Sequence, residues 1–170
     1  MPIVRPIPFK IEIAAQPTEA DREPILGELL VYNEANGGPA NYEPFAIRLR
    51  DTATGASVGG LWARIYYEWL YVDLLYVPEE ARGRDVGSKL LAKAEAFARR
   101  RGCVGIWLCT YSFQAPGFYR KLGYRAFGNL NDHPKGGKLI FFQKSLKAAP
   151  PRRKKSASRA AKPGRKRRLP

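Results

Sequence analysis

Residues 75–91 read LYVPEEARGRDVGSKLL and form the most informative part of the chain. An apolar strand ends at Pro78, a loop with two glycines and two arginines follows, and a helix begins near Ser88. Backbone N–H groups at the start of a helix, with arginine side chains beside them, suit the oxygens of a phosphorylated ligand. The pattern is neither GxxxxGK(S/T) nor GxGxxG, so it predicts another kind of anion site, or simply a glycine-rich turn with solvated arginines.

A second stretch about 25 residues later, residues 112–124, reads SFQAPGFYRKLGY. Together the two stretches closely resemble the GNAT superfamily of acetyl-CoA-dependent N-acetyltransferases. The first is similar to the family's pyrophosphate motif R/Q-x-x-G-x-G/A, with Arg82 first and Gly87 last. The second is similar to its A-x-x-x-Y-x-K-x-G-F/Y pattern, which here begins at Ala115 and contains Tyr119. The resemblance covers roughly residues 8–146.

The apolar residues along the chain recur at the periods of strands and helices. They predict strands at 9–13, 45–50, 57–67, 69–77, 104–109, 124–130 and 138–146, and helices at 18–36, 88–101 and 114–122. The strand at 69–77 is nearly all apolar, which predicts burial on both of its faces. We therefore expect an α/β fold, a single domain with a mixed central β-sheet and helices on both faces. The resemblance implies that this sheet is splayed in the middle, between the strands that end near Val77 and Cys109.

The resemblance also implies that acetyl-CoA is the co-substrate, and no metal is expected. The expected cofactor-binding residues lie on the strand end, the loop and the helix start, with one more after the next strand: Leu75, Tyr76, Val77, Arg82, Gly83, Arg84, Asp85, Val86, Gly87, Ser88 and Ser112. Two of them depart from the family pattern. Asp85 stands where the motif usually has its first glycine, and Ser112 stands where many members carry Asn.

Two residues are the expected catalytic groups. The resemblance places Tyr119 beside the sulfur of the cofactor, where its hydroxyl would protonate the leaving thiolate; the alternative is a core aromatic residue. Asp73 is an acid inside an apolar run, and burial would raise its pKa toward that of a useful base. A structural aspartate satisfied by a partner is the alternative for Asp73. Glu68, His133 and Cys109 are weaker candidates.

The net charge of +15 is unevenly distributed along the 170 residues. Residues 147–170 contain 11 Lys and Arg and no acid, whereas residues 1–146 carry a net charge of only +4. We therefore expect an acetyltransferase domain at 1–146 and a disordered tail at 147–170, because the tail has too few apolar side chains to offset its ordering entropy. Such a tail either binds nucleic acid or another polyanion weakly, or has no partner.

The expected function is transfer of an acetyl group from acetyl-CoA to the primary amine of a small molecule. Two alternatives remain, a protein-lysine acetyltransferase and a nucleic-acid-associated protein that uses the basic tail. No run of about 18 apolar residues and no signal-peptide pattern is present, so a cytoplasmic protein without a membrane partner is expected. A homodimer is left open.

Overall fold

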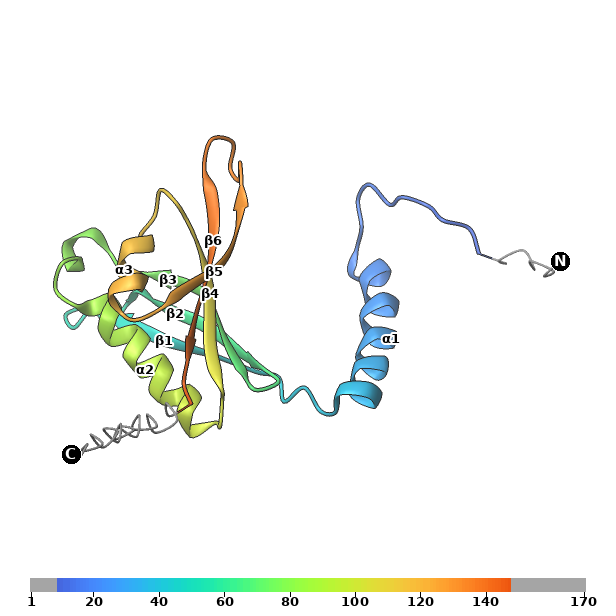
Figure 1. Cartoon of the computed structure of the whole chain (residues 1–170), viewed down its shortest axis with the longest axis horizontal. Helices are drawn as coiled ribbons and strands as arrows, with labels where there is room; N and C mark the ends of the chain where they lie inside the picture. The colour runs from blue at the N-terminus through green and yellow to red at the C-terminus, as the bar shows by residue number, and fades with distance from the viewer. Residues whose placement is uncertain (1–8, 148–170) are drawn as a thin grey trace, which may run out of the picture.

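The computed structural model describes residues 9–147, which contain one six-stranded sheet and three α-helices (Figure 1). The elements are α1 (Glu19–Gly37), β1 (Glu43–Arg50), β2 (Ser57–Tyr66), β3 (Trp69–Tyr76), the 3-10 turn η1 (Glu79–Ala81), α2 (Val86–Arg100), β4 (Gly105–Tyr111), α3 (Pro116–Lys121), β5 (Arg125–Asn131) and β6 (Lys138–Ser145). The sheet order is β1-β2-β3-β4-β6-β5; only β3 and β4 are parallel neighbours. The expected mixed α/β fold is confirmed.

The hydrophobic core lies between one face of the sheet and α2. The apolar stripe of α2 buries Leu90, Leu91, Ala94 and Ala98. Gly102 follows the helix with a positive φ of 75°, and the N–H of Cys103 returns to the Ala98 carbonyl, so the helix ends as a glycine cap predicts. The strands contribute a second set of buried side chains: Leu61, Ala63, Ile65, Leu70, Val72, Ile106, Leu108 and Phe142. Helix α3 packs on the same face, because its Tyr119 ring lies 5.9 Å from that of Phe142.

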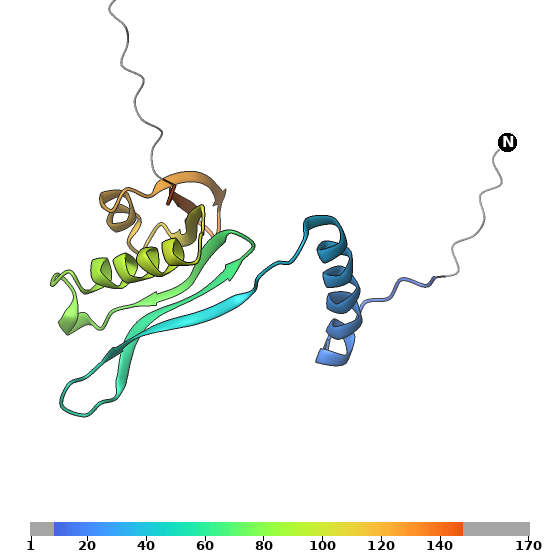
Figure 2. The same cartoon turned by 90° about the horizontal axis from the view of Figure 1, so that it is seen from below.

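The second face of the sheet carries no helix among the described residues, and we call it the open face (Figure 2). Along the central strands β2, β3 and β4, side chains on it alternate with the buried ones. The open face is formed by Trp62, Arg64, Tyr66, Trp69, Tyr71, Asp73, Trp107 and Phe141. The expectation that β3 is buried on both faces is therefore wrong. The apolar residues on this side of β3 lie on a face that no described helix covers.

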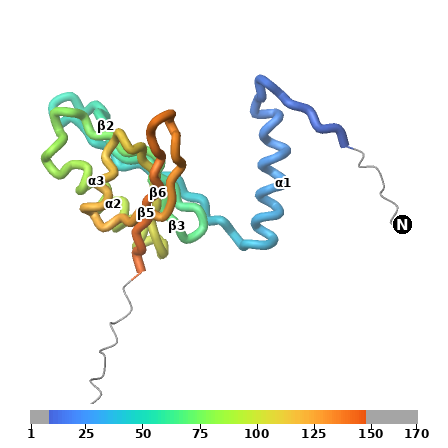
Figure 3. The backbone as a smooth tube through the Cα atoms, turned by 45° about the horizontal axis from the view of Figure 1, so that its top comes forward, coloured from blue at the N-terminus to red at the C-terminus, as the bar shows by residue number. Residues whose placement is uncertain are grey.

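Helix α1 forms where the sequence predicted it but lies apart from the sheet (Figures 1 and 3). Its first turn is fixed by a capping box, in which the Asp21 carboxylate accepts hydrogen bonds from the N–H and hydroxyl of Thr18. No residue of α1 is buried. The predicted strand at 9–13 is wrong, since these residues form no strand and their side chains are exposed. The described helices on the sheet, α2 and α3, thus share one face instead of the expected two, and α1 stands away from the sheet.

The two ends of the chain, membrane-spanning helices and metal sites were also subjects of the sequence analysis. Of the predicted tail, residues 148–170 lie outside the described residues, as do residues 1–8 at the other end. No helix within residues 9–147 combines the length and apolar character that crossing a bilayer requires. Across the same residues, no three His, Cys, Asp or Glu side chains gather closely enough to hold a metal ion.

Candidate active site

The sheet parts between its two parallel strands. β3 pairs with β4 only from Trp69 opposite Gly105 to Val72 opposite Leu108. Beyond this point β3 stays paired with β2 and β4 stays paired with β6, so the facing backbone edges of 73–76 and 109–111 have no strand partner. Those edges include the backbone of Leu75 and Tyr76. Unpaired peptide groups inside a sheet are available to a ligand, as the resemblance implied for this position.

A glycine-containing loop leads from the end of β3 into α2. The Arg82 Nε donates a hydrogen bond to the Val77 carbonyl at 3.1 Å, which closes the loop onto the strand it left. Gly83 has a φ of +71°, and Asp85, directly before the helix, has a φ of +59°. The Asp85 side chain makes no capping hydrogen bond. The first N–H groups of α2, those of Val86, Gly87 and Ser88, have no acceptor within the helix, as at any helix start, and Asp85 does not cap them. They point out of the positive end of the helix dipole.

Gly87 brings α2 and α3 into close contact. A Cβ at this position would lie 3.1 Å from the Phe118 ring of α3, so any larger residue requires that ring to shift. Phe118 precedes Tyr119, and their rings meet edge to face at 5.1 Å. The loop that offers backbone N–H groups and the helix that carries the expected proton donor are thus one packed unit.

Tyr119 sits where α3 meets the parted strands and is 8% exposed. Burial raises the pKa of Tyr119 to about 12, and the neighbouring Cys109 thiol adds to the increase. The cause is that a phenolate there would lose solvation and lie close to a group that can itself become negative. Tyr119 is therefore a neutral phenol throughout the physiological range, as a proton donor must be.

Asp73 differs from the sequence expectation in its surroundings. The pairing of β2 and β3 shifts register at this point, since Val72 lies opposite Ala63 and Leu74 opposite Trp62. Asp73 is the extra residue of this bulge and faces solvent on the open face. Its carboxylate accepts a hydrogen bond from Arg64 Nη1 at 2.6 Å, and the two side chains are 36% and 37% exposed. The expected burial of Asp73 is thus wrong, and the partnered aspartate is the arrangement found.

Two further groups near Asp73 escaped the sequence analysis. The Tyr71 hydroxyl lies 3.7 Å from the Cys109 sulfur, and burial, followed by the thiol, raises the pKa of Tyr71 to about 12. The Arg64 guanidinium lies over the Tyr71 ring at 4.6 Å. The alternation along β2 and β3 could have placed Arg64, Tyr71 and Asp73 on one face, but only the strand register shows that they touch.

The remaining candidates have separate places. Ser112 joins the end of β4 to β6: its hydroxyl accepts the Lys138 N–H at 3.1 Å, and its own N–H donates to the Lys138 carbonyl. His133, in the turn between β5 and β6, has its ring 5.7 Å from that of Tyr111 at the end of β4. Glu68 lies at the start of β3, where its carbonyl accepts the Val104 N–H, so it sits at the far end of the strand from the parting.

Comparisons with known proteins agree with this geometry. Residues 12–124 match the acetyltransferase (GNAT) family. Over 83 residues, 48% of this chain, the sequence is 48% identical to blasticidin-S acetyltransferase of Streptomyces morookaense, and the match spans 61% of that relative's length. Acetyltransferase Atu2258 of Agrobacterium fabrum is 35% identical over 130 residues, 76% of this chain and 91% of that protein. The crystal structure of an acetyltransferase from Bacillus cereus, 34% identical, superposes with a TM-score of 0.71 and covers 79% of this chain and 97% of that one.

Proposed function

The chain belongs to the GNAT acetyltransferase family, and from that premise we propose that it transfers an acetyl group from acetyl-CoA directly to the primary amine of a small molecule. One observation carries the proposal. Gly87 at the start of α2 lies against Val77, directly after β3, and against Phe118, which precedes Tyr119, and the neutral phenol of Tyr119 neighbours Cys109 on the parted part of β4. Each of these groups suits a different part of acetyl-CoA: the helix start suits the diphosphate, the strand edge suits the pantetheine arm, and the phenol suits the thioester sulfur.

The diphosphate would lie at the start of α2. The N–H groups of Val86, Gly87 and Ser88 would donate to its oxygens, and Arg84, which is exposed, would add a positive charge. Arg82 holds the loop through the hydrogen bond that its Nε donates to the Val77 carbonyl. Gly83 keeps the loop in a left-handed conformation that side chains disfavour.

The pantetheine arm would then follow the free edge of β3. The backbone of Leu75, Tyr76 and Val77 would hydrogen-bond the arm and polarise the acetyl carbonyl. Ser112, which already fixes the end of β4 to β6, keeps its hydroxyl proton available as a donor toward the same side. These contacts orient the thioester without covalent chemistry by the protein.

The reaction then needs two proton movements. The neutral amine forms a bond to the carbonyl carbon, the carbon–sulfur bond breaks, and the thiolate takes a proton from the Tyr119 hydroxyl to give free CoA thiol. The attacking nitrogen loses a proton to become the amide nitrogen. We propose Asp73 as its acceptor, because the carboxylate lies on β3 next to the parting and is open to solvent. Arg64 holds that carboxylate in place.

The small-molecule acceptor is supported by the relative named for blasticidin S, although the chain spans only about three fifths of that protein. The test is release of free thiol from acetyl-CoA across a panel of small amines that begins with blasticidin S, with a lysine peptide in parallel. We expect thiol release that depends on one of the small amines, with a matching mass increase of one acetyl group. Binding of acetyl-CoA without transfer to any small amine, or transfer to the peptide alone, would contradict the proposal.

A further inference from the structure

We propose that two copies of this chain exchange their N-terminal helices, so that α1 of each copy covers the open face of the other. This proposal goes beyond the acetyl transfer and does not depend on it. It rests on an uncovered helix, an uncovered sheet face of matching size, and a connection that directs the helix away from its own sheet.

The helix has an apolar side that nothing covers within residues 9–147. Ile25, Leu26, Leu29 and Leu30 lie within about 140° of one another around the helix axis, at about 100° per residue. Leu29 is 51% exposed and Ile25 is 72% exposed. Asp21, Glu28 and Glu34 lie outside this arc, whereas Glu19 falls within it. A helix of this kind gains most of its stability from packing its apolar side, which leaves α1 incomplete by itself.

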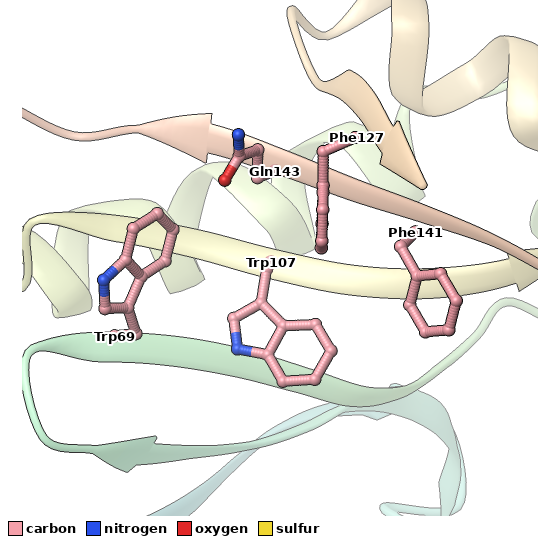
Figure 4. Close-up of a pocket in the computed structure, with 5 residues that line it drawn as sticks. All are labelled: Trp69, Trp107, Phe127, Phe141 and Gln143. Atoms are coloured by element: carbon pink, nitrogen blue, oxygen red, sulfur yellow. The ribbon is translucent and has the colours of Figure 1, made fainter. Parts of the chain in front are cut away.

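The open face is the matching uncovered surface. The rings of Trp69, Trp107, Phe127 and Phe141 project from four different strands and line a groove of about 460 Å³ (Figure 4). The Tyr71 ring packs on Trp107 with centroids 4.1 Å apart, which extends the aromatic surface toward the parted strands. An aromatic patch of this extent is a contact surface and not an ordinary exposed sheet face.

The length of the helix matches the width of the sheet, and the helix and residues 43–146 have net charges of opposite sign. The 19 residues of α1 span about 28 Å, and six strands spaced about 4.8 Å apart span about 24 Å between the outer strands. Helix α1 contains five carboxylates and one arginine, for a net charge of −4. Residues 43–146 contain 16 Lys and Arg against nine Asp and Glu, for a net charge of +7. The helix is thus long enough to cross the sheet, and its net charge is opposite in sign to that of residues 43–146.

The connection from α1 to β1 selects the other copy. The Tyr67 N–H, in the turn between β2 and β3, donates to the Ala40 carbonyl. Gly37 at the helix end lies against the Tyr67 ring, since a Cβ there would be 3.0 Å from the hydroxyl oxygen. These contacts fix both ends of a short link, and all three overall views show α1 held beyond the edge of its own sheet (Figures 1, 2 and 3).

In a two-fold dimer with exchanged helices, each of the two α1 helices covers one of the two open faces. A helix strip about 28 Å long and about 10 Å wide, counted on both surfaces and for both helices, buries roughly 1,100 Å². That area is close to the lower end of about 1,200 Å² for stable protein interfaces. Because Asp73 and Arg64 lie on the open face, each copy would also supply one wall of its partner's amine site.

The first test is the mass of the full chain by size-exclusion chromatography with light scattering. We expect twice the chain mass of 19.1 kDa for the wild type. The double variant Leu26→Glu and Leu29→Glu should give the single mass. The matched control Val31→Glu places the same residue on the opposite side of α1 and should remain a dimer. Circular dichroism checks that each variant is folded.

The second test distinguishes exchange from a helix that folds back. A photoreactive benzoylphenylalanine replaces Leu30 in two preparations, one labelled with nitrogen-15, which are mixed under conditions that allow subunit exchange. Peptide pairs between α1 and β3 or β4 should include one labelled and one unlabelled member in about half of the cases. Pairs of the same label only, no pairs with the open face, or a single-chain mass for the wild type would each overturn the proposal.

Discussion

Tyr119 has a buried ring and a hydroxyl that stays protonated. Removal of the hydroxyl alone tests whether it is the proton donor. Tyr119→Phe keeps the ring that packs on Phe142 and removes only the donor. We expect turnover to fall about 100-fold, with the Kd for acetyl-CoA little changed. Steady-state kinetics and calorimetry on the two proteins supply both numbers.

The pH profile provides the control for this prediction. The pKa of Tyr119 is raised to about 12, so the phenol remains a donor at every pH below that value. The wild-type rate should therefore rise with pH up to about 10, as the amine loses its proton, and should not fall from ionisation of this tyrosine. A decline that begins near neutral pH, or a Phe variant within about twofold of wild type, would exclude Tyr119 as the donor.

The negative charge of Asp85 would repel the diphosphate that its loop is proposed to bind. It occupies a left-handed conformation with φ of +59° at the start of α2, where an anion site favours positive or neutral groups. Asp85→Asn removes the charge and tolerates this conformation, whereas Asp85→Gly removes the charge and also the conformational strain. Both variants should bind CoA about two- to fivefold more tightly by calorimetry, the size of one charge at a helix end.

The pair of variants separates charge from conformation. Tighter binding by Asp85→Gly alone would mean that backbone strain, not charge, limits the affinity. Unchanged affinity in both variants would show that the diphosphate does not lie at this helix end, and would remove the main support for the loop as the cofactor site.

The contact between α2 and α3 is the structural link between cofactor and proton donor. In Gly87→Ala the new Cβ would lie 3.1 Å from the Phe118 ring, so the ring must shift by a few tenths of an ångström and carry Tyr119 with it. We expect kcat to fall severalfold, because displacement of about 1 Å costs about 100-fold. The melting temperature should change little. The gain of about 1 kcal/mol by which alanine favours a helix over glycine offsets the cost of shifting the Phe118 ring.

Gly117→Ala is the matched control. A Cβ at Gly117, in the first turn of α3, meets nothing within 4 Å. Its kcat and melting temperature should stay at or slightly above the wild-type values. If the two alanine variants showed equal kcat, the close approach at Gly87 would not be what positions Tyr119.

Local patterns predicted most helices and strands, because apolar periodicity and caps act within one element. Helix α1, expected at 18–36, forms at Glu19–Gly37, and α2 ends with the predicted glycine. Features that need a distant partner were missed. The strand expected at 9–13 has the right alternation but no neighbouring strand. Glu95, buried in α2, bonds Lys144 at 2.7 Å, a partner 49 residues away that no local pattern reveals.

The candidate site divides in the same way. The two motifs predicted the loop at 82–87 and the place of Tyr119, because each motif is a contiguous segment. The surroundings of Asp73 depend on a bulge, where two strands are one residue out of step, and the apolar neighbours of Asp73 suggested burial instead. Its partner Arg64 and the pair of Tyr71 with Cys109 follow from that register, which alternation within one strand cannot provide.

Most of the net charge of +15 lies at the C-terminal end of the chain. Residues 147–170 hold 11 of the 30 Lys and Arg, with no acid, and the sheet ends at Ser145. Leu146 is the last residue to join the core, with its N–H bonded to the Val104 carbonyl. The described core is thus complete at this residue. We propose that the tail binds polyanions weakly and without sequence preference.

Removal of residues 147–170 tests this proposal. The shortened chain should keep its melting temperature and its turnover on a small amine, because every described contact of the core and the site precedes residue 147. Binding of DNA or RNA by the full chain should weaken steeply between 50 and 200 mM salt and should vanish on truncation, since each neutralised phosphate releases counterions. Fluorescence anisotropy at the two salt concentrations, with acetylation assays on both chains, measures these quantities. Salt-insensitive binding that survives truncation would place a nucleic-acid site on the domain itself, whereas loss of small-amine turnover would show that the tail acts at the active site.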